Sequence, residues 1–170
     1  MGDVIVLETA RLRLRPLTLA DVDLWVALHA DERVNRYTGS YTRQAALDRL
    51  AGIEMQWSTR GHGLFAVELK ESGEFLGRGG LFYWQPFDEV EAGWTLRPEA
   101  WGHGYATEAA RAFLDWGFET LDVPYVIAMI RPGNTPSVKV AERLGFSVRR
   151  QDALFDEPVT VYALDRPAGR

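Results

Sequence analysis

The segment from Leu96 to Ala109 carries two glycines, Gly102 and Gly104, between a strand-like run and a helix-like run. Glycine lets the backbone approach a ligand closely, and the unpaired N–H groups at the positive end of a helix dipole attract phosphate groups. The segment is therefore a candidate pyrophosphate-binding loop. The same glycines also fit a strand-to-helix turn that binds nothing, and the spacing alone leaves both interpretations open.

This loop departs from two familiar phosphate-binding fingerprints. Thr107 stands where a dinucleotide-binding fingerprint has its third glycine, and the Lys-Ser/Thr pair of a nucleotide P-loop is absent. The pattern therefore predicts neither a Rossmann-type domain nor a P-loop NTPase.

Composition limits the class of protein. The 170 residues suit one domain, residues 1–170, and 46% hydrophobic with 25% charged residues is typical of a globular chain. Cysteine is absent, which excludes thiolate metal sites and an acyl-cysteine intermediate. The 24 acidic and 19 basic residues give a net charge of -5, which argues against nucleic-acid binding and weakly favours a cationic substrate.

Targeting and metal-binding signals are not found. The run from Met1 to Leu7 lacks the basic start and cleavage site of a secretory signal, and no stretch approaches the ~20 apolar residues of a membrane span. We therefore expect a cytoplasmic protein that binds no membrane. His29, His62 and His103 lie far apart and lack ligand-like spacing with carboxylates, so no metal is predicted.

The elements that must position the loop follow from periodicity. A period of two predicts strands, and apolar residues at helical spacing predict helices, most clearly from Ala106 to Leu121. Thr18 and Asp21 resemble a capping box that opens a first helix, and a second helix is expected after Thr42. The expected strands are 11–15, 64–69, 75–84, 90–96, 124–130, 146–150 and 159–164, with a further helix over 137–144. This order predicts a mixed α/β layer architecture.

A longer motif surrounds the glycine loop, namely Gly93-Trp94-x-Leu96-x-Pro98-x-x-Trp101-Gly102-x-Gly104-Tyr105-Ala106-Thr107-Glu108-Ala109. It resembles the main motif of the GNAT acetyltransferases, and more narrowly of the branch named for ribosomal-protein N-terminal acetyltransferases. Two further segments match that branch, namely Glu8-Thr9-Ala10-Arg11-Leu12-x-Leu14-Arg15 and Asn134-x-x-Ser137 with Leu144-Gly145-Phe146. Trp101 replaces the Gln or Arg that opens the general loop motif, and aromatic residues are usual there in this branch.

The resemblance implies a fold and a cofactor. The fold would be a GNAT-type mixed, mostly antiparallel sheet of about seven strands, splayed at the cofactor slot and flanked by about four helices. The co-substrate would be acetyl-CoA, with no metal. Its pantetheine arm and acetyl carbonyl would meet the backbone of Trp94, Thr95 and Leu96. Its pyrophosphate and neighbouring groups would meet Gly102, His103, Gly104, Tyr105, Ala106, Thr107 and Asn134.

Acetyl transfer to an amine needs a neutral amine, a donor for the developing oxyanion and an exit for the thiolate. An alkyl amine with a pKa of ~10.4 is mostly protonated at neutral pH, and freeing it costs roughly 4–5 kcal/mol. The resemblance assigns this proton to Glu91, directly or through water. A solvent-facing strand glutamate is the alternative.

Other groups complete the expected chemistry. The resemblance places the Ser137 hydroxyl near the cofactor sulfur, although Ser137 also suits a helix cap or first turn after Pro136. The backbone N–H of Thr95 or of a neighbour is the candidate oxyanion donor. Tyr105 and Tyr162 are reserve acids, or else belong to the core or the wall of the site. Because no cysteine is present, direct attack in a ternary complex is the mechanism left.

Aromatic residues would line the acceptor side of this fold, or else pack in the core. They are Trp25, Tyr37, Tyr41, Trp57, Phe82, Trp84 and Phe87, of which Tyr37 and Trp84 are the predicted substrate contacts. They could stack on a cationic or apolar amine. The segment from Asn35 to Gly39 is the expected acceptor loop. Four acidic residues either attract a cation or are merely solvated, namely Asp31, Glu32, Asp88 and Glu89.

The predicted function is an acetyl-CoA-dependent N-acetyltransferase acting on a primary amine. The acceptor would be a small molecule or a protein N-terminus, with a small amine favoured because fold does not fix substrate. A non-catalytic acyl-CoA-binding sensor or scaffold is the alternative. Homodimers are common in the family that the chain resembles, but no residue here demands one.

Overall fold

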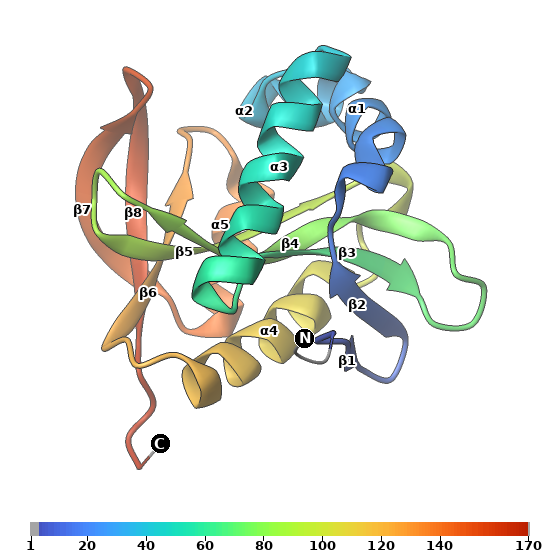
Figure 1. Cartoon of the computed structure of the whole chain (residues 1–170). Helices are drawn as coiled ribbons and strands as arrows, with labels where there is room; N and C mark the ends of the chain where they lie inside the picture. The colour runs from blue at the N-terminus through green and yellow to red at the C-terminus, as the bar shows by residue number, and fades with distance from the viewer. Residues whose placement is uncertain (1–3, 170) are drawn as a thin grey trace.

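One sheet of eight strands runs through residues 4–169, the part of the chain that the computed structural model describes (Figure 1). The order across the sheet is β1-β2-β3-β4-β5-β6-β8-β7. The strands are β1 (Leu7–Glu8), β2 (Leu12–Pro16), β3 (Leu64–Leu69), β4 (Phe75–Trp84), β5 (Glu89–Leu96), β6 (Tyr125–Ile130), β7 (Ser147–Leu154) and β8 (Glu157–Asp165). The helices are α1 (Val22–Ala30), α2 (Glu32–Thr38), α3 (Arg43–Arg60), α4 (Tyr105–Thr120) and α5 (Thr135–Leu144), with short 3-10 turns at Leu19–Asp21 and Pro98–Ala100.

Strands β5 and β6 are the one parallel pair of neighbours within these residues, and a single register pair, Glu91 with Ile127, joins them. Every other pair of neighbours is antiparallel with a longer register. The two strands therefore splay, as the resemblance implied, and the edge of β5 beyond Glu91 is left to other partners.

Helices cover the two faces of the sheet in separate groups. Helices α1, α2 and α3 lie above the sheet in Figure 1, and α4 lies below it. Helix α4 approaches β4 closely, because a Cβ at Gly117 would lie 2.4 Å from Leu81. The buried positions of α4, which include Ala110, Phe113 and Leu114, recur at helical spacing, so the predicted amphipathic helix is confirmed.

The predicted opening of the first helix is also confirmed. Thr18 and Asp21 form a capping box, with the Thr18 N–H donating to Asp21 Oδ2 at 2.9 Å. The capped turn is a 3-10 turn that continues into α1. Asp21 is also held by Arg15, whose Nη2 lies 2.9 Å from Asp21 Oδ1, so the cap ties the helix to β2.

The N-terminal half contains more elements than predicted. The segment Asn35 to Thr38, expected as a loop, belongs to helix α2, and Asp31 caps that helix by accepting from the Arg33 N–H at 2.9 Å. A two-residue strand, β1, precedes β2. Strands β7 and β8 run several residues longer than expected. The described residues thus hold eight strands and five helices, where about seven and about four were predicted.

Candidate active site

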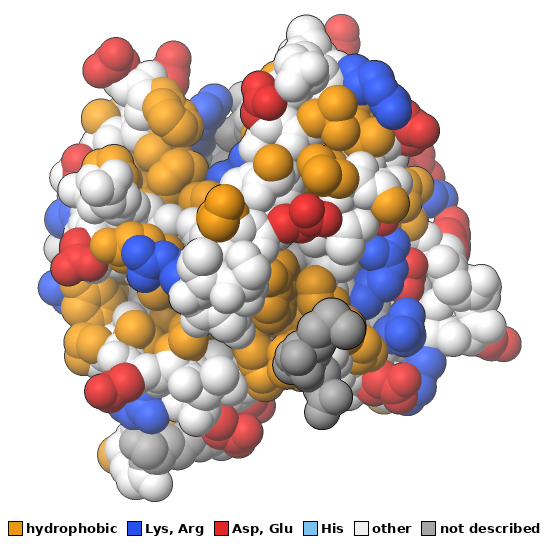
Figure 2. Space-filling model, in the orientation of Figure 1, with side chains coloured by type: hydrophobic (Ala, Val, Ile, Leu, Met, Phe, Trp, Pro, Cys, Tyr) orange, Lys and Arg blue, Asp and Glu red, His pale blue; other side chains and the backbone are white. Residues whose placement is uncertain are grey.

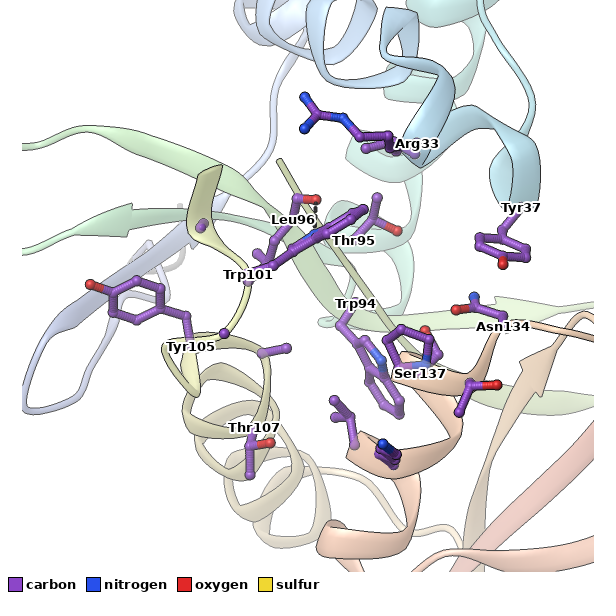
Figure 3. Close-up of a pocket in the computed structure, with 18 of the residues that line it drawn as sticks. Arg33, Tyr37, Trp94, Thr95, Leu96, Trp101, Tyr105, Thr107, Asn134 and Ser137 are labelled. Carbon is purple, nitrogen blue, oxygen red and sulfur yellow. Dashed lines mark hydrogen bonds between the residues drawn. The ribbon is translucent and has the colours of Figure 1, made fainter. Parts of the chain in front are cut away.

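A cavity of about 780 Å³ lies at the open end of β5, between α2, the start of α4 and the start of α5 (Figure 3). It brings together eleven of the predicted site residues: Tyr37, Trp94, Thr95, Leu96, Gly102, Gly104, Tyr105, Ala106, Thr107, Asn134 and Ser137. His103, Glu91 and Trp84 do not line it. Segments far apart in sequence thus meet at one site.

The glycine loop has the geometry of an anion-binding turn. Gly102 and Gly104 have φ of 79° and 78°, in the left-handed region that favours glycine. Gly104 is the N-cap of α4 and provides no side-chain acceptor, so the N–H groups of the first turn, residues 105–107, are not capped by it. Residues 105–107 line the cavity, so these groups lie beside it at the positive end of the helix dipole.

Arg11 and Glu108 brace this loop. Arg11 Nη2 donates to the His103 carbonyl at 2.9 Å, and Arg11 Nε donates to Glu108 Oε1 at 2.8 Å. The Arg11 guanidinium also lies 4.4 Å from the centre of the Tyr105 ring. The His103 ring packs beside Tyr105, at 5.4 Å between centroids, rather than lining the cavity. Sequence reasoning did not assign this role to Arg11, because the two ends of the contact lie 92 residues apart.

Four cations and no acidic residue are among the side chains that line the cavity, in a chain whose net charge is -5. They are Arg33, Arg36, Lys139 and Arg143. Arg33 is paired with Asp31 at 2.7 Å, whereas Lys139 and Arg143 stand one turn apart on α5. The Thr107 hydroxyl is buried there without a hydrogen-bond partner in the described residues. This donor set fits a ligand with several phosphates.

Glu91 is half-buried at the splay, so the alternative of a solvent-facing strand glutamate is wrong. Its Oε1 accepts from Trp84 Nε1 at 2.8 Å, and its Oε2 accepts from the Met129 backbone N–H at 3.0 Å. Burial raises the pKa of Glu91 above its ordinary value, although these hydrogen bonds and the charges of Arg49 and Arg78 oppose the rise. A carboxyl with a raised pKa is suited to accepting a proton near neutral pH.

Gly93 connects Glu91 to the cavity. Residues 91, 93 and 95 point to one face of β5, because side chains alternate along a strand. A Cβ built on Gly93 would meet no atom within 4 Å, so space is open above it. This space lies between Glu91 and Thr95, and Thr95 lines the cavity.

The remaining predicted residues divide between the cavity and its surroundings. Ser137 lies in the first turn of α5 rather than at its N-cap, which is Asn134. Tyr37 bridges the cavity by donating from its hydroxyl to the Gly133 carbonyl at 3.1 Å. Trp84 lies outside it, with its ring 4.9 Å from Phe82 and its N–H engaged by Glu91.

Several of the other aromatic and acidic residues considered above are packed or paired within the protein. Trp25 is buried, with Tyr41, Trp57 and Phe82 packed against its hydrophobic cluster. Glu89 is buried and binds Arg150 and Tyr125, and Asp88 accepts from Tyr83. Tyr162 packs against the main core. The acidic side chains are thus hydrogen-bonded to other residues of the protein, and the aromatic ones pack in or against its hydrophobic core.

Two absences apply to residues 4–169. No helix there is long and apolar enough to cross a lipid bilayer. In the same range, no three His, Cys, Asp or Glu side chains are grouped so as to hold a metal ion.

The chain matches the family model described as Acetyltransferase (GNAT) domain over residues 11–147. An acetyltransferase crystal structure from Agrobacterium tumefaciens str. C58 is 34% identical, with a TM-score of 0.86 and 96% of each chain covered. The "Uncharacterized N-acetyltransferase p20" of Bacillus licheniformis is 31% identical over 82% of this chain and 81% of that protein. YkkB of Bacillus subtilis (strain 168) is 38% identical over 63% of this chain, and the match spans 64% of YkkB.

The chain therefore belongs to the GNAT acetyltransferase family. It is an N-acetyltransferase of that family, and the family uses acetyl-CoA. A structure described as RimL, a ribosomal L7/L12 alpha-N-protein acetyltransferase, in complex with coenzyme A, shares the fold with a TM-score of 0.79 at 16% identity. The predicted fold and enzyme class are confirmed.

Proposed function

We propose that this enzyme transfers the acetyl group of acetyl-CoA directly to a primary amine in a ternary complex. The observation that carries the proposal is the continuity of the site: an anion-binding cavity at Gly104 and Thr95 adjoins the open space above Gly93, which ends at Glu91. A nucleotide thioester and an amine would meet at Thr95.

The cofactor would lie along the cavity. The uncapped first turn of α4 would bind the pyrophosphate, and the Thr107 hydroxyl would gain the acceptor that it lacks. Lys139 and Arg143 would neutralise further phosphate charge. The backbone edge of Trp94 and Thr95 would pair with the amide groups of the pantetheine arm. Acetyl-CoA supplies an activated acyl carbon that an amine can attack without a protein nucleophile.

Glu91 would take the proton that the substrate ammonium must lose, directly or through a water above Gly93. The amine nitrogen would then form a C–N bond to the acyl carbon as the C–S bond breaks. The sulfur would leave with the electron pair of that bond, and the acylated nitrogen would lose its second proton to solvent to give the neutral amide. The backbone N–H of Thr95 would donate to the carbonyl oxygen as its negative charge develops. The Ser137 hydroxyl would donate a proton to the leaving sulfur and regain one from solvent.

The acceptor in this proposal is a small molecule or a protein N-terminus. Tyr37, which bridges the cavity, would form one wall of the site where the acceptor amine binds. RimL supports the second alternative only as a protein that shares the fold, because its identity to this chain is 16%.

The test is to mix the full chain with acetyl-CoA and a panel of amines and to follow free thiol. We expect thiol release that depends on the amine, and a melting temperature that rises with acetyl-CoA. Glu91→Gln should lower kcat at least tenfold with little change in CoA affinity. A chain that shows neither a CoA-dependent thermal shift nor thiol release would overturn the proposal, and tight CoA binding without turnover would favour a sensor.

A further inference from the structure

Two arginines lie on the amine side of the splay. Arg78 of β4 is directly opposite Thr95 of β5, and Phe82 is directly opposite Glu91, so all four side chains share one face of the sheet. Arg49 of α3 covers this face, with its guanidinium carbon 4.1 Å from the centre of the Phe82 ring. Figure 2 shows Lys or Arg side chains at the hollow between α3 and the β7–β8 hairpin.

Neither arginine has a carboxylate partner. None of the ion pairs within 4.0 Å in residues 4–169 involves Arg49 or Arg78. Burial lowers the pKa of both groups, that of Arg78 to about 10, and the charge of Arg49 adds to the effect on Arg78. Both side chains are half-buried, and cations taken this far out of water are normally paired, so two together point to a missing anion.

Arg78 is held so that part of its guanidinium stays free. Its Nε–H donates to His29 Nε2 at 3.2 Å, and the described residues offer its two Nη groups no acceptor. His29 is fully buried and its pKa is lowered to about 2, by burial first and then by Arg78 and Arg49, so its ring is neutral. His29 Nδ1 must then carry the proton and donate to Thr38, which lines the cavity.

Charge on this face is therefore unbalanced. Arg49 and Arg78 provide two positive charges and Glu91, whose pKa is raised by burial, provides at most one negative charge, while His29 is neutral. The aromatic faces that could stack on a cationic amine are already covered, since Arg49 lies over Phe82 and Trp84 and Arg78 lies over Trp25 at 4.6 Å. These contacts oppose the cationic substrate that net charge weakly favoured.

We propose that the acceptor amine also carries a carboxylate, which Arg49 and Arg78 bind while the amino group faces Glu91. The inference rests on the proposed function and adds a substrate class to it. Arginine suits this role because its planar fork binds a carboxylate through two parallel hydrogen bonds. The acceptor class is thus an amino acid or a similar zwitterionic amine.

The test compares matched substrates with and without the negative charge. Each of several L-amino acids is paired with its carboxamide, and spermidine, ethanolamine and phosphoethanolamine complete the panel. We expect kcat/KM at least tenfold higher for each acid than for its amide. Arg78→Met and Arg49→Met should remove this preference chiefly through KM, and Arg78→Lys should restore part of it. Arg60→Met, which removes an exposed arginine that stacks on Tyr83, should change nothing.

A binding measurement separates this inference from the proposed function. N-acetyl-L-alanine should raise the melting temperature of the CoA-bound protein more than N-acetyl-L-alaninamide does, and Arg78→Lys, which keeps the charge if Arg78→Met fails to fold, should retain part of the difference. Turnover of amides or spermidine at equal rates, with no such difference, would overturn the inference alone. Preference for phosphoethanolamine over every amino acid would replace the carboxylate by a phosphate and also overturn it. If the protein binds N-acetyl-L-alanine more tightly than its amide but acetylates no amine, the proposed function is overturned, while the carboxylate-binding site of Arg49 and Arg78 is supported.

Discussion

Trp101 Nε1 donates to the Leu96 carbonyl at 2.8 Å, so the indole that stands in place of the usual loop residue ties the glycine loop to the end of β5. The dashed line in Figure 3 marks this bond, which joins two residues that line the cavity. It already uses one lone pair of the Leu96 carbonyl, so Leu96 has less to offer the pantetheine arm than Trp94 and Thr95 have. The bond fixes the distance between the two parts of the proposed cofactor site.

Trp101→Phe should therefore loosen the loop. The ring remains but the donor is lost, and we expect CoA affinity to fall several-fold while the free energy of unfolding falls by about 1 kcal/mol. Trp57→Phe is the matched control, because Trp57 Nε1 donates to the Leu64 carbonyl at 3.0 Å, on a residue that does not line the cavity. Calorimetric titration with CoA compares them, and equal affinity losses would count against this role of Trp101.

Gly104→Val should abolish CoA binding. A β-branched residue is strongly disfavoured at φ of 78°, so the first turn of α4 must shift away from its ligand. Gly104→Asn should bind CoA more tightly than Gly104→Val, because asparagine tolerates the left-handed region. Gly73→Val carries the same backbone strain at φ of 77° in the β3–β4 turn, away from the cavity. Normal CoA binding by Gly104→Val would show that the pyrophosphate lies elsewhere.

The cations on α5 should set the salt dependence of CoA binding. Replacing both Lys139 and Arg143 by glutamine should weaken CoA at least tenfold at low ionic strength, and the difference should shrink as salt is added. Arg43→Gln removes a charge that does not line the cavity, because Arg43 pairs with Asp23 of α1, and should leave the affinity unchanged. An affinity loss that is independent of salt would argue against direct phosphate contacts.

Acid should destabilise the protein partly through His29. Its pKa is about 2 when folded and ~6.5 when unfolded, so between these values the unfolded state binds more protons. Stability is therefore lost as pH falls below ~6.5, by up to ~1.4 kcal/mol per pH unit for this one group. His29→Gln should flatten the plot of unfolding free energy against pH, and His62→Gln should flatten it further, because burial lowers the pKa of His62 as well.

Sequence alone predicted the parts of this fold whose signals are local. The apolar spacing of α4 and the Thr18–Asp21 capping box needed only neighbouring residues. Helix α2 was missed because it is seven residues long and mostly polar, so its one signal was the Asp31 cap. The glycine loop was predicted because its backbone needs glycine at two left-handed positions.

The site residues that sequence could not predict are those that depend on contacts between distant parts of the chain. Arg11, Arg49 and Arg78 look like ordinary charged residues until the sheet register and α3 bring them to the site. One local signal of a phosphate contact was available in the sequence. Lys139 and Arg143 lie four residues apart on a predicted helix that follows the Asn134 motif, so both could have been predicted to face the same ligand. The environment of Glu91 depends on Met129, which lies 38 residues away.

The hydrogen bond from the Met129 N–H to Glu91 gives the splay a spectroscopic reporter. Charge on a carboxylate moves the chemical shift of the amide that donates to it, so the Met129 amide resonance should titrate with Glu91 although β6 itself contributes no titratable group at that bond. Its hydrogen-exchange rate should respond as well, because the bond weakens when the acceptor is neutral. Protonation of Glu91 could thereby be followed by NMR at a backbone amide of the neighbouring strand.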